Sequence, residues 1–210
     1  MADNMNWEIH NDVLLLKHPD GELEIPSAEF IFNCFFNASD SADEFKNSFS
    51  PENTFKDLKP SKYPLELEGR ITAEKLNNDI KLLFSVWGVR ADVEIEIKGF
   101  LTRKADHIIF DDVWYPFVRG AFESFKDLMI KIGVDASGVL NFRQYLDLIL
   151  QEPVPVSDHT SQITDARSWS GELPDPGKAI SFTGNLYDYQ EQGFRWLLMM
   201  VRNNLGCILA

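Results

Sequence analysis

Residues 69–98 read GRITAEKLNNDIKLLFSVWGVRADVEIEIK, and a change of hydrophobic period within them predicts a fold that mixes helices with strands. Over residues 69–89 the apolar side chains recur at helical spacing, which predicts an amphipathic helix with Thr72 as its N-cap and Gly88 at its end. Those side chains are Leu76, Ile80, Leu83, Phe84 and Trp87. Over residues 93–97 apolar and charged residues alternate, which is typical of a half-buried strand.

The chain before this stretch carries a hairpin signal. Apolar runs at residues 13–16 and 22–25 flank Asp20-Gly21, a dipeptide that favours the positive φ angles of a tight hairpin turn. Residues 30–36 are apolar on nearly all sides, so their pattern fits a strand and a buried helix equally well. The polar residues 41–49 predict a short helix.

The chain after this stretch is expected to return to β-structure and then to form two helices. Residues 103–106 are expected to turn, residues 107–110 to pair as a strand with 93–97, and residues 114–116 to form an aromatic turn. Two amphipathic helices are then predicted. The first covers about residues 120–132 and ends at Gly133, and the second covers residues 141–150, with Asn141 as its cap and Phe142, Tyr145, Leu146 and Ile149 facing inward.

These elements predict an α+β architecture in three parts. Residues 1–150 are expected to form one α+β domain, because strands and helices alternate without a regular βαβ rhythm. Residues 151–185 are rich in Pro and Ser and predict a linker, ordered in part around Trp169. Residues 186–210 predict a helix followed by the start of a buried strand.

Composition limits the classes of function. The formal net charge is −13 over 210 residues, and no long run of Lys or Arg offsets it, so this segment is a poor candidate for a main DNA-binding surface. Cys34 and Cys207 stand alone, which argues against a zinc site or a disulfide framework and favours a reducing cytoplasm. The polar N-terminus predicts no leader peptide, and no apolar run approaches the roughly 18 residues that span a membrane.

The chemistry concentrates in the last 25 residues. They contain Leu186-Tyr187-Asp188-Tyr189-Gln190-Glu191-Gln192-Gly193-Phe194-Arg195-Trp196-Leu197 and then Gly206-Cys207-Ile208-Leu209-Ala210. This stretch resembles the Swi/Snf-type ATPases of helicase superfamily two. Those proteins carry L-x-x-Y-Q-x-x-G-x-x-W-L and then, a short way downstream, G-[GC]-I-L-A-D before the phosphate loop M-G-L-G-K-T. Both halves match in register, whereas Tyr187 stands where the family usually has a basic residue.

The resemblance implies the start of a RecA-like motor lobe. It makes Gln190 the reader of the adenine edge, because an amide offers a donor and an acceptor side by side, and it places Tyr189 and Leu186 around the base. ATP and Mg²⁺ are the implied cofactors of a full-length parent, and the rest of the motor and DNA are its implied partners. The chain stops before the phosphate loop, so no catalytic residue, no metal ligand and no bound cofactor are expected in this segment.

Residues 1–150 would then be an accessory domain that regulates the motor or recruits a protein partner, in a cytoplasmic and bacterial translocase without membrane contact. Two other classes of function stay open. The chain can be an acidic protein-interaction module without ATPase activity. It can also be a small hydrolase built on His107, Asp111 and Asp112, although these residues more simply form a strand edge with solvated acids.

Two further groups of residues have simpler interpretations. Trp87, Trp114, Tyr115, Phe117, Phe122 and Phe125 can stack on unpaired bases, but aromatic residues of this kind more often fill a core. Arg90, Lys98, Arg103 and Lys104 are the main local basic group, which is expected to solubilise the tip of a hairpin rather than to bind phosphate.

Overall fold

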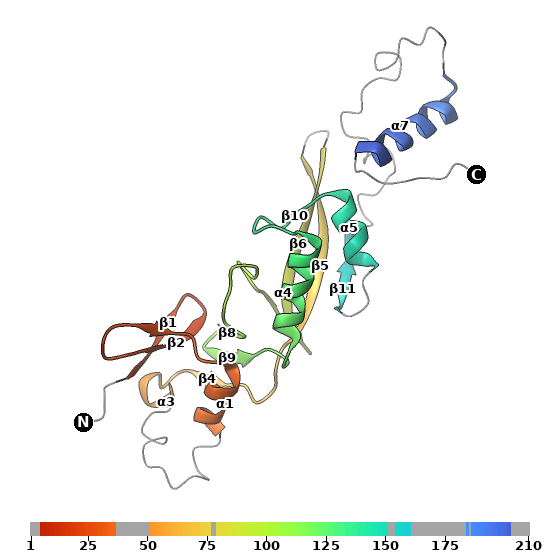
Figure 1. Cartoon of the computed structure of the whole chain (residues 1–210). Coiled ribbons are helices and arrows are strands. Elements are labelled where there is room, and N and C mark those ends of the chain that lie inside the picture. Colours follow the sequence, from red (N-terminus) through yellow and green to blue (C-terminus); the bar gives the residue numbers. More distant parts are fainter. Residues whose placement is uncertain are drawn as a thin grey trace. The chain divides into compact units, whose positions relative to one another are not determined.

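The structure is a computed structural model that describes residues 5–36, 51–76, 79–150, 154–160, 184 and 186–202 (Figure 1). Within these residues helices and strands are mixed, which confirms the predicted α+β class. The contacts divide the chain into two compact units. The first unit is Met1–Glu68 with Val86–Asp127, and the second is Gly69–Ser85 with Leu128–Ala210, so the division lies inside the range expected to be one domain.

The first unit begins with an antiparallel sheet of the order β1-β2-β3. Its strands are β1 (Asn6–His10), β2 (Val13–Lys17) and β3 (Leu23–Glu24). Leu16 pairs with Glu24 across the two strands, so the predicted hairpin is confirmed, but its loop covers residues 18–22 and only Gly21, with a φ of 91°, has the positive φ expected of both turn residues. The two-residue loop between β1 and β2 uses Asn11 at a φ of 58°, a conformation that Asn tolerates better than most residues.

A helix completes the core of this sheet. Residues 30–36, which the pattern left between strand and helix, belong to α1 (Ala28–Phe36). Ala28 and Ile31 are the buried residues of α1, and they pack with one continuous apolar cluster. The other buried members of the cluster are Trp7, Leu14, Leu16, Leu58 and Trp114. The cluster therefore joins residues from the start of the chain to residues about a hundred positions later.

A second sheet of the first unit has the order β4-β9-β8. Its strands are β4 (Lys59–Pro60), β8 (His107–Phe110) and β9 (Val113–Pro116), and the short helix α3 (Pro51–Thr54) precedes them. Two predictions are wrong here. Residues 107–110 pair with β9 rather than with 93–97, and the expected aromatic turn at 114–116 is part of β9. The chain instead reverses at Asp111 and Asp112, whose φ angles of 48° and 59° suit a two-residue hairpin turn.

The largest sheet has the order β10-β6-β5-β11, with β7 paired to β6. Its strands are β5 (Glu66–Leu76), β6 (Asp79–Arg90), β7 (Val93–Glu96), β10 (Val139–Leu140) and β11 (Val156–Asp158). The predicted strand at 93–97 is confirmed. Ile95 and Ile97 are buried, while Glu94 and Glu96 are exposed.

The helix predicted over residues 69–89 is wrong, because these residues contribute to β5 and β6. Leu82, Phe84 and Val86 are buried and Gly88 lies on the same face, whereas Leu83, Trp87 and Val89 on the other face are half-buried. A strand with apolar residues on both faces loses its visible period of two, and its members then fall by chance at helical spacing. One feature of the sequence argues against a continuous helix here. Asn77-Asn78 stands in the middle of the pattern, and Asn favours turns over helix interiors.

Two helices confirm their predictions. The first, α4 (Ala121–Ile132), is followed by Gly133 at a φ of 74°, the left-handed conformation that ends many helices. The second, α5 (Phe142–Ile149), has Asn141 as its cap, and Asn141 and Gln144 form a reciprocal capping box. The inward face of α5 was predicted wrongly at one position. Ile149 is exposed, and the buried side chain is Leu148.

The strand β11 lies in the range predicted to be a linker. It pairs in parallel with β5, and the bonds Gly69 N–H to Pro155 O (2.8 Å) and His159 N–H to Ile71 O (2.8 Å) extend this pairing. Beside it, the Tyr145 hydroxyl of α5 donates to Asp158 Oδ2 (2.7 Å), and Asp158 Oδ1 accepts from the Thr160 N–H (2.8 Å). Asp158 therefore connects α5 to the chain that follows β11.

Removing this connection should loosen the edge of the sheet. We expect Tyr145→Phe to lower the protection of the His159 amide against hydrogen exchange by about fivefold to tenfold, which corresponds to about 1 kcal/mol for one hydrogen bond. Tyr187→Phe is the matched control, since the Tyr187 side chain is largely exposed. Equal protection of His159 in both variants would show that the hydroxyl does not hold β11.

The last described element is α7 (Asp188–Arg202), which confirms the helix predicted after residue 186. Among the residues that the structure describes, no helix is both long enough and apolar enough to cross a membrane. The short helix expected at 41–49, the order expected around Trp169 and the strand expected at 206–210 lie outside the described residues.

Candidate functional site

The first turn of α7 holds Tyr189 and Gln190, and Leu186 just precedes it; these are the residues to which the resemblance assigns adenine recognition. The Gln190 N–H donates to Tyr187 O (2.8 Å), and the Gln190 side-chain oxygen Oε1 accepts from the Tyr187 N–H (3.1 Å). This is the return bond of a helix cap, in which the third residue of the helix satisfies the N–H just before its start. The bond fixes one end of the Gln190 amide, and the Nε2 group at the other end is a donor only.

The two tyrosines beside Gln190 stack on each other. The rings of Tyr187 and Tyr189 are nearly parallel, at 5° with 6.0 Å between centroids, and the side chains are 71% and 70% exposed. Leu186 is half-buried just before the helix. The structure thus brings Tyr187, rather than Leu186, against both Tyr189 and Gln190. In the sequence, Tyr187 stands out only as a departure from the family pattern.

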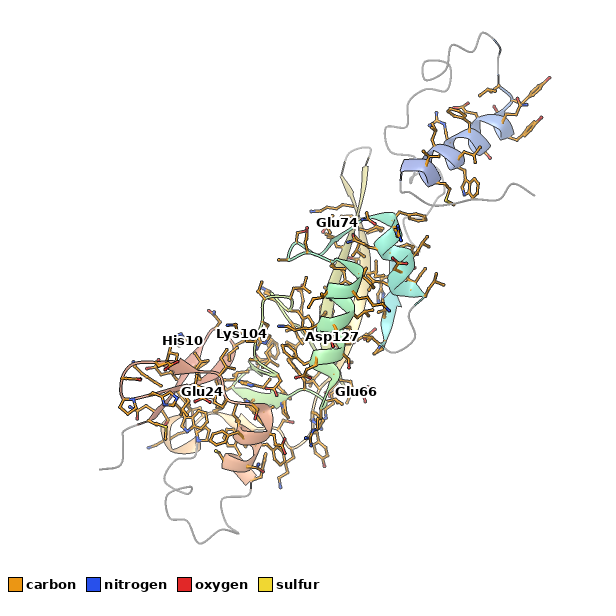
Figure 2. The ribbon with its side chains drawn as sticks, viewed as in Figure 1. His10, Glu24, Glu66, Glu74, Lys104 and Asp127 are labelled. Carbon is orange, nitrogen blue, oxygen red and sulfur yellow. The ribbon has the colours of Figure 1, made fainter. Side chains whose placement is uncertain are left out.

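The rest of α7 carries apolar side chains that stay at least partly exposed to solvent. None of its described residues is buried, and side chains project from several sides of the helix (Figure 2). Trp196 and Val201 are exposed, whereas Phe194 and Leu197 are half-exposed. A helix of 15 residues is marginal in water when no tertiary packing supports it. The ion pair between Arg195 and Glu191 at 2.7 Å is partly exposed and contributes little.

The hydrolase interpretation of His107 requires a nearby acid, and the structure does not bring Asp111 or Asp112 to it. His107 begins β8 and is fully buried, while the two aspartates lie in the exposed turn at the other end of the strand. His107 Nε2 instead accepts from the Leu14 N–H (3.1 Å), and its Nδ1 faces Asp106 Oδ1 (3.4 Å). An accepting Nε2 places the ring proton on Nδ1, so the folded chain requires a neutral imidazole.

Asp106 extends this polar cluster to α1. Its Oδ1 also accepts from the Ala28 N–H (2.8 Å) at the start of that helix. Burial alone would raise the pKa of Asp106, but the hydrogen bonds from His107 and from Ala28 outweigh it, and the pKa lies below its ordinary value. Asp106 therefore stays ionised at neutral pH and anchors both the histidine and the helix.

Arg103 has a structural role as well, so the prediction that it solubilises a hairpin tip is wrong. Its guanidinium is buried, and Nη1 donates to both carboxylate oxygens of Asp12 at 2.8 and 2.9 Å. Nη2 donates to His107 O (2.7 Å), and Lys126 of α4 donates to Arg103 O. We call Asp12, Arg103, Asp106 and His107 the polar joint.

The other singled-out residues divide between the surface and the core. Arg90 is half-buried over the Tyr63 ring at 4.4 Å, whereas Lys98 and Lys104 are exposed. The expectation that the aromatic set fills a core is confirmed for Trp114, Phe117, Phe122 and Phe125, which are buried, while Trp87 and Tyr115 are half-buried. Within the described ranges, no group of three or more His, Cys, Asp or Glu residues is arranged to hold a metal ion.

Comparisons with family models, with curated proteins and with solved structures give no match to this chain.

Proposed function

We propose that this chain is the N-terminal accessory segment of a DNA-dependent ATPase translocase of the Swi/Snf type. The observation that carries the proposal is the two-part motif, in which residues 186–197 and 206–210 match the family pattern in register. Residues 186–210 would begin the first RecA-like lobe, and the parent would bind ATP and Mg²⁺ and move on DNA in the cytoplasm.

Two features of α7 support this proposal, whereas the Gln190 Oε1 would bond adenine only by using its second lone pair or by leaving the Tyr187 N–H. The motif residues from Tyr189 to Leu197 lie on one helix, and Gln190 occupies its exposed first turn. A Cβ added at Gly193 would meet nothing within 4 Å, so this position leaves room for a close neighbour. The uncovered apolar side chains of α7 are those that a surrounding motor lobe would bury.

The accessory role of residues 1–150 rests on charge. A chain with a net charge of −13 repels a phosphate backbone, so DNA would be held by the motor lobes rather than by this segment. An acidic segment can recruit a basic protein partner, or it can occupy the basic cleft of its own motor in place of DNA. Deletion of residues 1–150 from the parent should therefore raise its basal ATPase rate or its DNA affinity, and unchanged values would exclude autoinhibition.

The same acidity favours one alternative, a protein-interaction module without ATPase activity. The codons that follow Ala210 distinguish the two. A continuation of the form D-x-M-G-L-G-K-T supports the motor, and a stop codon supports the module.

The direct test of the motor is ATP hydrolysis by a protein extended through both lobes. We expect DNA-stimulated ATPase activity there, and a rise of about tenfold to a hundredfold in the KM for ATP in Gln190→Ala, because lost base contacts cost about 1–3 kcal/mol. Gln192→Ala is the matched control on the exposed surface of the same helix. Equal KM values in the two variants would remove Gln190 from the nucleotide site, and an extended protein without ATPase activity would refute the proposed function.

A further inference from the structure

Among the described residues, hydrogen bonds from Asp12 and Leu14 of the β1–β2 hairpin reach residues 103–109, beside the apolar packing of Trp7, Leu14 and Leu16 with Trp114. The Leu14 N–H donates to His107 Nε2, and the Ile109 N–H donates to Asp12 O (2.8 Å). Arg103 Nη1 adds a contact to both oxygens of the Asp12 carboxylate. Of these bonds, the one at His107 depends on a side chain that changes charge near neutral pH.

The groups that face His107 are arranged for the neutral ring. Asp106 holds the proton on Nδ1, and the Leu14 N–H from β2 occupies Nε2. Arg103 is the nearby cation, and its charge is already matched by Asp12 from the β1–β2 loop. From β9 the ring of Trp114 lies 6.0 Å away, and α1 contributes the Ala28 N–H to Asp106. A second proton at Nε2 would point at an N–H donor inside the core.

We infer that His107 is an acid-sensitive latch, whose protonation at Nε2 removes the acceptor for the Leu14 N–H and releases the β1–β2 hairpin while the second compact unit stays folded. This inference does not depend on the proposed function.

The direction of the pH effect follows from burial. Burial holds the pKa of His107 below its ordinary value of 6.5, Asp106 acts in the opposite direction, and Arg103 adds to the lowering. The released ring regains the ordinary value, so below pH 6.5 the open form binds a proton that the docked form excludes. The latch is therefore fully closed above this pH and weakens as the pH falls toward the folded-state pKa. Asp106 keeps its charge over this range, because its own pKa is lowered from 3.8.

The test is amide hydrogen exchange of this chain, followed by NMR between pH 7.5 and 5. One proton taken up on opening predicts that the protection factor of the Leu14 amide falls about tenfold per pH unit below 6.5 and stays level above it. The reference is the Phe84 amide of the second unit, which donates to Gly138 O (2.8 Å) and should show no such slope.

Two variants separate the latch from the two histidines of the β1-β2-β3 region, His10 and His18. In the variant His107→Gln, the glutamine side chain keeps an acceptor oxygen but cannot take up a proton. The protection factor of the Leu14 amide should then no longer depend on pH below 6.5. The pair His10→Gln with His18→Gln should keep the slope, because His10 is exposed, His18 is half-buried, and they bond Glu8 and Glu24 within their own sheet. The inference is overturned if, in the unmodified chain, the protection factor of the Leu14 amide stays constant below pH 6.5, or if that of the Phe84 amide falls equally. Because both amides are measured in the unmodified chain, this comparison tests the inference even if His107→Gln does not fold.

Discussion

Gly138→Ala is expected to destabilise the second unit by about 3 kcal/mol, because two costs add at one position. Gly138 has a φ of 67°, which costs a residue with a Cβ roughly 1–2 kcal/mol. The added Cβ would also lie 2.5 Å from the backbone oxygen of Phe84, which is too close for any contact. Residues at the start of β10 must then move away from β6, and the bond from the Phe84 N–H to Gly138 O is weakened.

The matched control is Gly120→Ala. Gly120 has a similar φ of 77°, but a Cβ there would meet nothing within 4 Å. We expect urea unfolding to show a loss of about 1 kcal/mol for Gly120→Ala and a clearly larger loss for Gly138→Ala. Equal losses would mean that backbone strain alone matters and that β10 does not press on β6.

Arg103→Met is expected to cost about 2–3 kcal/mol, less than the loss of a fully buried ion pair, because the Asp12 side chain is 31% exposed. Met preserves much of the apolar stem, so the loss reports on the guanidinium. Without it, the half-buried carboxylate of Asp12 and the buried carbonyl of His107 lose their donors. Thermal unfolding should show the loss as a lowered Tm.

A surface pair provides the comparison. Arg143 lies 3.9 Å from Asp147 one helical turn away, with exposed fractions of 64% and 47%, so Arg143→Met should cost about 0.5 kcal/mol or less. A double-mutant cycle then tests the contact itself. If Arg103→Met and Asp12→Asn act through one bond, the double variant should lose at least about 1 kcal/mol less than the sum of the single variants. Additive losses would contradict the ion pair.

Local signals in the sequence were enough for several elements. The Asp20-Gly21 hairpin, the end of α4 at Gly133 and the cap of α5 at Asn141 each depend on residues within a few positions of one another. Such features are set by backbone preferences and short side-chain bonds, which the sequence displays directly.

Features that depend on distant partners could not be read in this way. The pattern of β6 matched a helix because both of its faces carry apolar residues, and β8 was assigned the wrong partner because pairing depends on the whole sheet. The strand β11 could not be predicted, because it lies in a Pro-rich range and its three residues form a strand by pairing with β5.

The site shows the same division. A short motif identifies Gln190. The polar joint cannot be recognised in this way, because its members form hydrogen bonds with residues 78 to 93 positions away in the sequence. Spacing suggested grouping His107 with Asp111, but His107 stands at the buried start of β8, and the length of the strand separates it from the exposed turn at Asp111-Asp112.

The long reach of the polar joint has a consequence for synthesis on the ribosome. Leu14 emerges 93 residues ahead of His107, its hydrogen-bond acceptor, and at about 5–20 residues per second this gap lasts about 5–20 seconds. Throughout that interval Trp7, Leu14 and Leu16 lack Trp114, a central member of their cluster. The nascent N-terminus is therefore a candidate client for chaperones that bind apolar segments at the tunnel exit.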